Sequence, residues 1–169
     1  MMSNTKKLVL AGVLVAIGLL LPSVFHFVVP SLARTLSPLH LPAFFAGFLL
    51  GGPWGLAVGL ITPLLSSLWT GMPPLFPMGV SMMVEIGLYG LISGLLIKEY
   101  KIKNVIVVLL LAILVGRLGF TITMNSINGI INPVAWSIGL YANIVAGIPA
   151  IILQCILIPL LIPRLEKVL

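Results

Sequence analysis

Long apolar segments separated by short polar stretches dominate this chain. Six segments can be drawn, at 8–29, 41–50, 53–68, 78–97, 105–124 and 138–162. A helix rises about 1.5 Å per residue, so about 20 apolar residues cross the hydrocarbon core of a bilayer. The pattern therefore predicts an all-α membrane protein. We expect a compact bundle of six transmembrane helices that forms a single domain over residues 1–169.

Two of the six segments are short for a full span. Residues 41–50 and 53–68 could instead form a re-entrant pair that enters and leaves the membrane on one side. The first segment has the lysines and apolar run of a signal peptide, but its apolar character continues through 22–29. That length favours a first membrane helix.

The composition supports the membrane class. The chain is 60% hydrophobic and only 7% charged, whereas a soluble domain carries about 25% charged residues. Its net charge of +6 comes from short basic clusters between the apolar segments. Such clusters set orientation in a bilayer, so we expect a lipid environment and no nucleic-acid partner. The single Cys155 excludes an internal disulfide.

The basic clusters also predict the topology. Lys6 and Lys7 precede the first segment, 98–103 lies between the fourth and fifth, and 164–167 follows the sixth. With six spans all three clusters fall on one side, which the positive-inside rule assigns to the cytoplasm. We expect both termini in the cytoplasm of a bacterial cell and the loops 30–40, 69–77 and 125–137 outside.

Two lone charges lie inside the predicted spans. Glu85 and Arg117 each sit seven or eight residues from the outer end of a segment, which is about 10–12 Å deep. Burial of an unpaired charge in hydrocarbon is costly, so opposite charges at one depth are expected to face a shared interior space. Two interpretations stay open: an ion pair that joins the fourth and fifth helices, or the lining of a substrate cavity open to the outside.

Further polar groups gather toward the same outer end. Thr121 and Asn128 share a helical face with Arg117, and Asn143 begins a similar face in the last segment. For His40 and Trp69 the alternative to substrate binding is anchoring at the membrane interface. For Asn125 and Asn128 the alternative is turn formation. The candidate substrate-binding residues are Glu85, Arg117, His40, Asn125, Asn128, Trp69, Thr121 and Asn143.

Catalytic and nucleotide-binding motifs are missing from the sequence. There is no G-x-x-x-x-G-K-[ST] phosphate loop, no H-E-x-x-H and no G-x-S-x-G. His and Cys residues do not have metal-ligand spacing. We therefore expect no ATP hydrolysis by this chain, no enzymatic activity, no metal and no cofactor.

The region 36–96 is similar to a known family. A short apolar helix is followed by Gly-Gly-Pro-Trp-Gly-Leu and by a helix that ends in PLLSSLWTG. With this pattern the chain resembles the substrate-binding S components of energy-coupling factor (ECF) transporters. The resemblance implies a six-helix bundle that captures a vitamin-like molecule near the outer face. It also implies a membrane T component and two cytoplasmic ATPase subunits as partners.

The resemblance further implies a docking face on the first helix. In the family, small residues four apart on this helix contact the T component. Gly12 and Ala16 have this spacing here, and Ala11 lies beside them. Small residues at this spacing let another helix approach closely. The alternative is an ordinary packing face within the bundle.

The ligand is not readable from the sequence. Among molecules that the family carries, pyridoxine, hydroxymethylpyrimidine, pantothenate and niacin suit an acid and a base at one depth. The chief rival is a stand-alone secondary transporter that carries a proton on Glu85, which Arg117 nearby would oppose. A membrane protein without a transport function is the second rival.

Overall fold

The computed structural model describes residues 2–28, 38–129 and 133–168, which are helical apart from short connections and contain no strand. A turn of 3-10 helix at Pro38–His40 precedes α3, and the short turns Leu75–Gly79 and Leu95–Glu99 extend α5 at its two ends. The helices are α1 (Asn4–Val28), α3 (Leu41–Leu50), α4 (Gly52–Thr70), α5 (Val80–Gly94), α6 (Val105–Ile127) and α7 (Pro133–Val168).

The all-helical prediction is confirmed, and each predicted segment coincides with one helix. The main difference is length: α7 has 36 residues, which corresponds to about 54 Å. The predicted segment 138–162 ended before Pro163 and the charged residues that follow it. The helix continues because the backbone hydrogen bonds of its last turns do not require apolar side chains.

Four stretches of the described residues are long and apolar enough to cross a membrane. A shorter apolar helix, Pro38–Leu50, falls below this length. The described residues therefore show a multi-pass membrane protein with four candidate spans. These stretches are Asn4–Pro22, Leu75–Glu99, Val105–Ile127 and Trp136–Lys167.

The short helix α3 lies in the centre of the bundle. Phe44 and Phe48 are fully buried, and α3 contacts α1, α4, α5 and α7. Gly51, with φ of +103°, connects α3 to α4, and this backbone conformation is open to glycine and strained for other residues. The chain can therefore reverse within one residue and pack α4 beside α3.

The helices α4 and α5 are in contact backbone to backbone. A Cβ atom added to Gly55 would overlap the carbonyl of Gly90, and one added to Gly94 would overlap the backbone at Gly52. Gly59 meets the Ile86 carbonyl in the same way. We call Gly52, Gly55, Gly59, Gly90 and Gly94 the glycine seam. It places the small-residue face of α5 against α4 and leaves Glu85 on another side of α5, where it meets Arg117 of α6.

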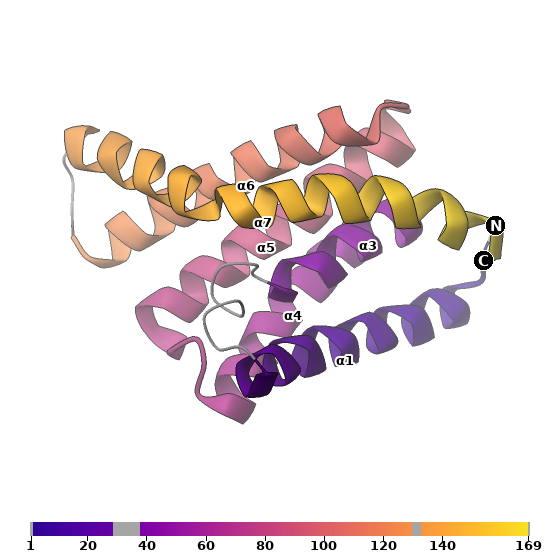
Figure 1. Ribbon diagram of the computed structural model, residues 1–169, viewed down its shortest axis with the longest axis horizontal. Coiled ribbons are helices and arrows are strands. Elements are labelled where there is room, and N and C mark those ends of the chain that lie inside the picture. Colours follow the sequence, from indigo (N-terminus) through magenta and orange to yellow (C-terminus); the bar gives the residue numbers. More distant parts are fainter. Residues whose placement is uncertain (1, 29–37, 130–132, 169) are drawn as a thin grey trace.

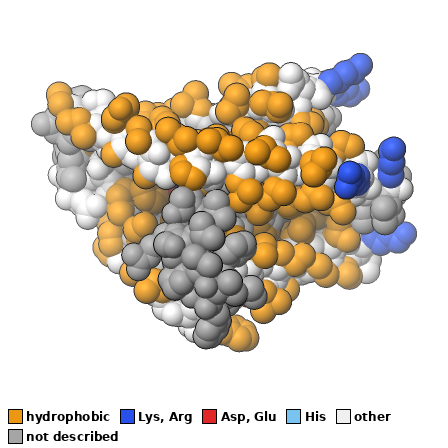
Figure 2. All heavy atoms as spheres, in the orientation of Figure 1, with side chains coloured by type: hydrophobic (Ala, Val, Ile, Leu, Met, Phe, Trp, Pro, Cys, Tyr) orange, Lys and Arg blue, Asp and Glu red, His pale blue; other side chains and the backbone are white. Residues whose placement is uncertain are grey.

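Charge and apolar surface are separated along the molecule. Both termini lie at the same end (Figure 1). On the face drawn in Figure 2, lysine and arginine side chains gather at that end, and hydrophobic side chains are spread over the rest of the described surface. This distribution suits a bundle whose apolar sides face lipid and whose basic end meets an aqueous interface.

Candidate functional site

Glu85 of α5 and Arg117 of α6 form a buried ion pair. Arg117 Nη1 lies 3.0 Å from Glu85 Oε1, and the two side chains are 8% and 3% exposed. The expectation that the two charges meet in the interior is confirmed. Because each charge neutralises the other, neither bears the full cost of burial alone.

Tyr89 completes the environment of the carboxylate. Its hydroxyl donates a 2.7 Å hydrogen bond to Glu85 Oε1. Phe44 of α3 stacks on the Tyr89 ring with centroids 4.9 Å apart, and His40 meets the ring edge-on at 5.3 Å. Gly116 makes room, because a Cβ atom there would overlap the Tyr89 ring. Sequence reasoning missed Tyr89, although its position one helical turn after Glu85 was a readable signal.

Arg117 also links α6 to α7. Its Nη1 donates a hydrogen bond to Asn143 Oδ1. A Cβ atom at Gly147 would overlap the guanidinium, so glycine at this position lets Arg117 reach across. Thr121 donates to the backbone oxygen of Arg117 at 2.9 Å. We call Glu85, Tyr89, Arg117 and Asn143 the polar cluster; it joins α5, α6 and α7.

Several buried polar atoms in and around the polar cluster have no hydrogen-bond partner among the described residues. These atoms are the two ring nitrogens of His40, Arg117 Nε, Asn125 Nδ2, Asn143 Nδ2 and Ser67 Oγ. His40 is buried, with 3% exposure, so it is not an interfacial group that reaches water. Most buried polar atoms in proteins are hydrogen-bonded. The described residues therefore leave the hydrogen-bonding capacity of these atoms unsatisfied.

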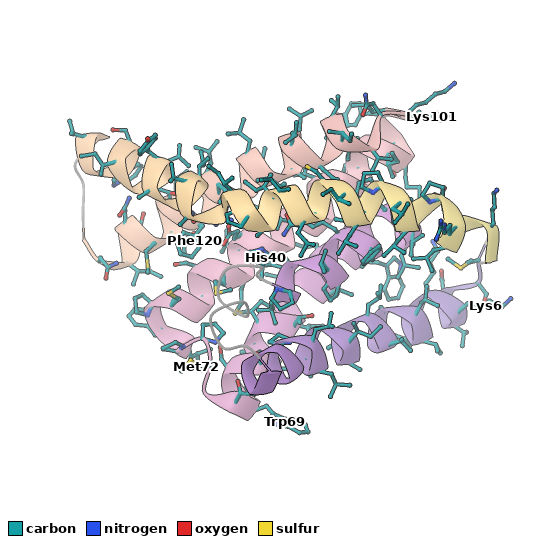
Figure 3. The ribbon with its side chains drawn as sticks, in the orientation of Figure 1. Lys6, His40, Trp69, Met72, Lys101 and Phe120 are labelled. Atoms are coloured by element: carbon teal, nitrogen blue, oxygen red, sulfur yellow. The ribbon has the colours of Figure 1, made fainter. Side chains whose placement is uncertain are left out.

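Two sequence candidates lie apart from this arrangement. Trp69 is 83% exposed at the end of α4, and Figure 3 shows it at the periphery, away from His40. The Asn128 side chain donates to the Met124 carbonyl at the end of α6, as a turn-forming residue would. No contact among the described residues joins either residue to the polar cluster, so their roles in binding stay predictions.

The predicted docking residues divide between two sides of α1. Gly12 has open space where a Cβ would stand, and Ala16 is exposed beside it. Ala11 is buried in the hydrophobic core. Ala11 therefore does not share the outward face of Gly12 and Ala16 in the described bundle, and its role in docking stays a prediction. Packing within the described bundle does not account for Gly12 and Ala16.

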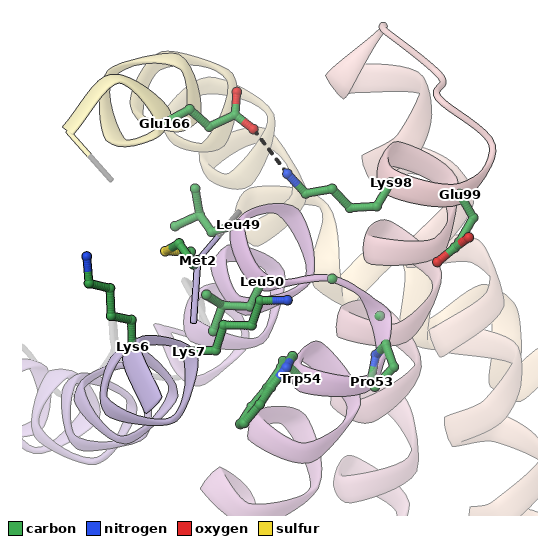
Figure 4. A pocket seen from close by; sticks show the side chains of 12 residues that line it. Met2, Lys6, Lys7, Leu49, Leu50, Pro53, Trp54, Lys98, Glu99 and Glu166 are labelled. Carbon is green, nitrogen blue, oxygen red and sulfur yellow. Dashed lines mark ion pairs between the residues drawn. The ribbon is translucent and has the colours of Figure 1, made fainter. Parts of the chain in front are cut away.

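A separate hollow lies at the end that carries the termini. It has a volume of about 820 Å³, and its lining includes Lys6, Lys7 and Trp54. Across it Lys98 Nζ lies 3.6 Å from Glu166 Oε1 (Figure 4). Lys98 follows Glu85 by 13 residues, which is about 20 Å along the helix axis. This hollow is therefore distinct from the polar cluster.

Comparison with known protein families gives one description for nearly the whole chain. The family described as "ECF transporter, substrate-specific component" matches residues 6–162. Neither the curated proteins nor the solved structures include a match to this sequence. The family is a class of transporter components and not a class of enzymes. The chain belongs to the substrate-specific components of ECF transporters, and it is a multi-pass membrane protein.

Proposed function

We propose that this chain captures a small water-soluble vitamin or vitamin precursor at the polar cluster, as the substrate-binding subunit of an ECF importer. The observation that carries the proposal is the group of buried polar atoms without partners around Glu85 and Arg117. Such atoms cost free energy in an apolar bundle unless another molecule completes their hydrogen bonds. A substrate-specific component requires a set of placed donors and acceptors of this kind.

The proposal extends to topology and partners. We infer six membrane-spanning helices with both termini in the cytoplasm of a bacterial cell. The position of both termini at the end where basic side chains gather supports this orientation (Figures 1 and 2). Delivery of the substrate then depends on a T component in the membrane and two ATPase subunits in the cytoplasm.

The ion pair argues against the rival function. In a stand-alone secondary transporter Glu85 would take up and release a proton. Arg117 at 3.0 Å stabilises the carboxylate charge and so opposes protonation of Glu85. Uptake measured in cells that lack the ATPases separates the two functions. The proposal requires uptake to stop there, whereas uptake that persists and collapses with an uncoupler would favour the rival.

The direct test of substrate capture is ligand identification. Mass spectrometry of the detergent-purified protein should detect a co-purified small molecule, whose affinity is then measured by titration calorimetry. Asn143→Ala should bind it at least tenfold more weakly, which is about 1.4 kcal/mol. Ser137→Ala is the matched control, because Ser137 lies on the same helix with an exposed side chain. Equal affinity in both variants would remove Asn143 from the site.

The partner assignment has its own test. Gly12→Leu should retain ligand affinity but lose co-purification with the T component, because a large side chain prevents close helix approach. Ala146→Leu, at an exposed small residue on α7, is the control and should assemble normally. Normal assembly of Gly12→Leu would move the docking face elsewhere.

A further inference from the structure

The buried charges of the described bundle sum to zero. Among the side chains whose burial is described, at 2–22, 38–129, 134 and 136–167, Glu85 and Arg117 are the ionic members of the buried set. Its other polar members are neutral groups such as Thr121 and Gln154. The two opposite charges are paired at 3.0 Å. A net charge on a bound molecule would therefore lack a counter-charge among these buried residues, in a medium where an uncompensated charge is costly.

The free atoms at the site are mainly hydrogen-bond donors. A guanidinium has donors and no acceptor, so the atom of Asn143 that faces Arg117 must be its oxygen, and Nδ2 is the free atom. Arg117 Nε also carries a hydrogen without a partner, and so does Asn125 Nδ2 as placed. A neutral His40 adds one donor and one acceptor.

We propose that the molecule bound at the polar cluster carries no net charge and is rich in hydrogen-bond acceptors, such as ring nitrogens, carbonyl oxygens or hydroxyl oxygens. This inference rests on the proposed function and narrows its substrate class. In this inference Glu85 and Arg117 neutralise each other, so the two side chains do not bind the opposite charges of a zwitterionic ligand. Pyridoxine and hydroxymethylpyrimidine fit this class, whereas niacin and pantothenate each bring a carboxylate.

Matched ligand pairs test the inference. Nicotinamide carries an amide where niacin carries a carboxylate. Panthenol carries an alcohol where pantothenate carries a carboxylate. Titration calorimetry on the full chain in detergent, with pyridoxine and hydroxymethylpyrimidine added to the panel, measures all six. We expect at least one uncharged probe to bind, and each carboxylate to bind at least tenfold more weakly than a binding uncharged counterpart. A carboxylate that binds as tightly as its counterpart would overturn the inference.

The co-purified molecule gives an independent readout. If mass spectrometry identifies a molecule with net charge, the inference on substrate class fails while the proposed capture function stands. If nothing co-purifies and no probe binds, the proposed function fails and the inference fails with it.

A variant then tests the charge argument within the protein. Glu85→Gln leaves Arg117 as an uncompensated cation, so the affinity ratio of niacin to nicotinamide should rise at least tenfold over wild type. Tyr89→Phe, which keeps both charges, is the control and should leave this ratio unchanged. The ratio compares two ligands on one variant, so a uniform loss of stability does not alter it. An unchanged ratio in Glu85→Gln would overturn the inference.

Discussion

The described residues contain two ion pairs of similar chemistry in opposite surroundings. Glu85 and Arg117 lie 3.0 Å apart with side chains 3% and 8% exposed. Lys98 and Glu166 lie 3.6 Å apart with side chains 43% and 48% exposed. Water and dissolved salt screen the second pair, while the first is held inside the bundle by Tyr89 and Asn143.

The comparison teaches that surroundings decide what a charge pair contributes. An exposed pair contributes about 0–1 kcal/mol to stability, because its charges are nearly as well solvated apart as together. A buried pair adds little over an apolar replacement, yet removal of one partner costs about 3–5 kcal/mol because the other charge is stranded. An acidic and a basic side chain therefore contribute little to stability at the surface, whereas in the interior neither can be removed alone without a large loss of stability.

The largest effect is expected from Arg117→Met. It leaves the Glu85 carboxylate buried without its counter-charge, and we expect the free energy of unfolding to fall by about 3–5 kcal/mol. Thermal denaturation of the purified variant in detergent measures this. A melting temperature equal to that of wild type would show that Glu85 is relieved of an uncompensated charge, by water or by protonation.

The next effect concerns the hydroxyl of Tyr89. Tyr89→Phe keeps the ring and its stack on Phe44 but removes the hydrogen bond to the carboxylate. Hydrogen bonds to charged groups contribute about 1.5–3 kcal/mol, and we expect a loss in that range. Phe44→Leu serves as a comparison, because it disturbs the stack and leaves the hydrogen bond in place. Full stability of Tyr89→Phe would mean that the hydroxyl is dispensable.

A double variant sharpens the comparison. Glu85→Gln combined with Arg117→Met removes both charges, so no stranded ion remains. We expect it to be about 1–2 kcal/mol less stable than wild type, because Asn143 Oδ1 loses its donor. It should therefore melt above Arg117→Met alone. If the loss of stability in the double variant equals the sum of the losses in the two single variants, the two charges are not energetically coupled.

The smallest effect is expected at the exposed pair. Lys98→Ala should lower the free energy of unfolding by no more than about 1 kcal/mol, and high salt should abolish the difference from wild type. Denaturation at two salt concentrations checks both points. A loss as large as that of Arg117→Met would contradict the contrast between the two regions.

Part of this site could be predicted from the sequence because polar residues are rare in the apolar segments. Glu85 and Arg117 stand alone in apolar runs, and their matched depth predicts a meeting that the structure contains. Asn143 followed from helical spacing. Tyr89 was missed because a tyrosine in a membrane helix is ordinary, and its partner Phe44 lies on another helix, so only the tertiary fold brings them together.

The first helix shows where sequence reasoning fails. Apolar residues surround α1 on all sides, so the pattern gives no inward face. Gly12 and Ala16 have the spacing of a docking face, but Ala11 next to them points into the core. Only the packing of α1 against α3 and α4 decides which side is open. Residues 30–37 of the predicted outer loop 30–40 lie outside the described residues.

The glycine seam has a mechanical consequence. Where two backbones touch directly, there are no rotamers to exchange and no side-chain ridge over which one helix can slide. We therefore expect the helices α4 and α5 to move as one rigid pair that tilts or translates without separation of the two helices. Shape changes that admit or release a substrate must then occur outside this interface, for example where α1 packs against α4 or where α7 packs against α3 and α6.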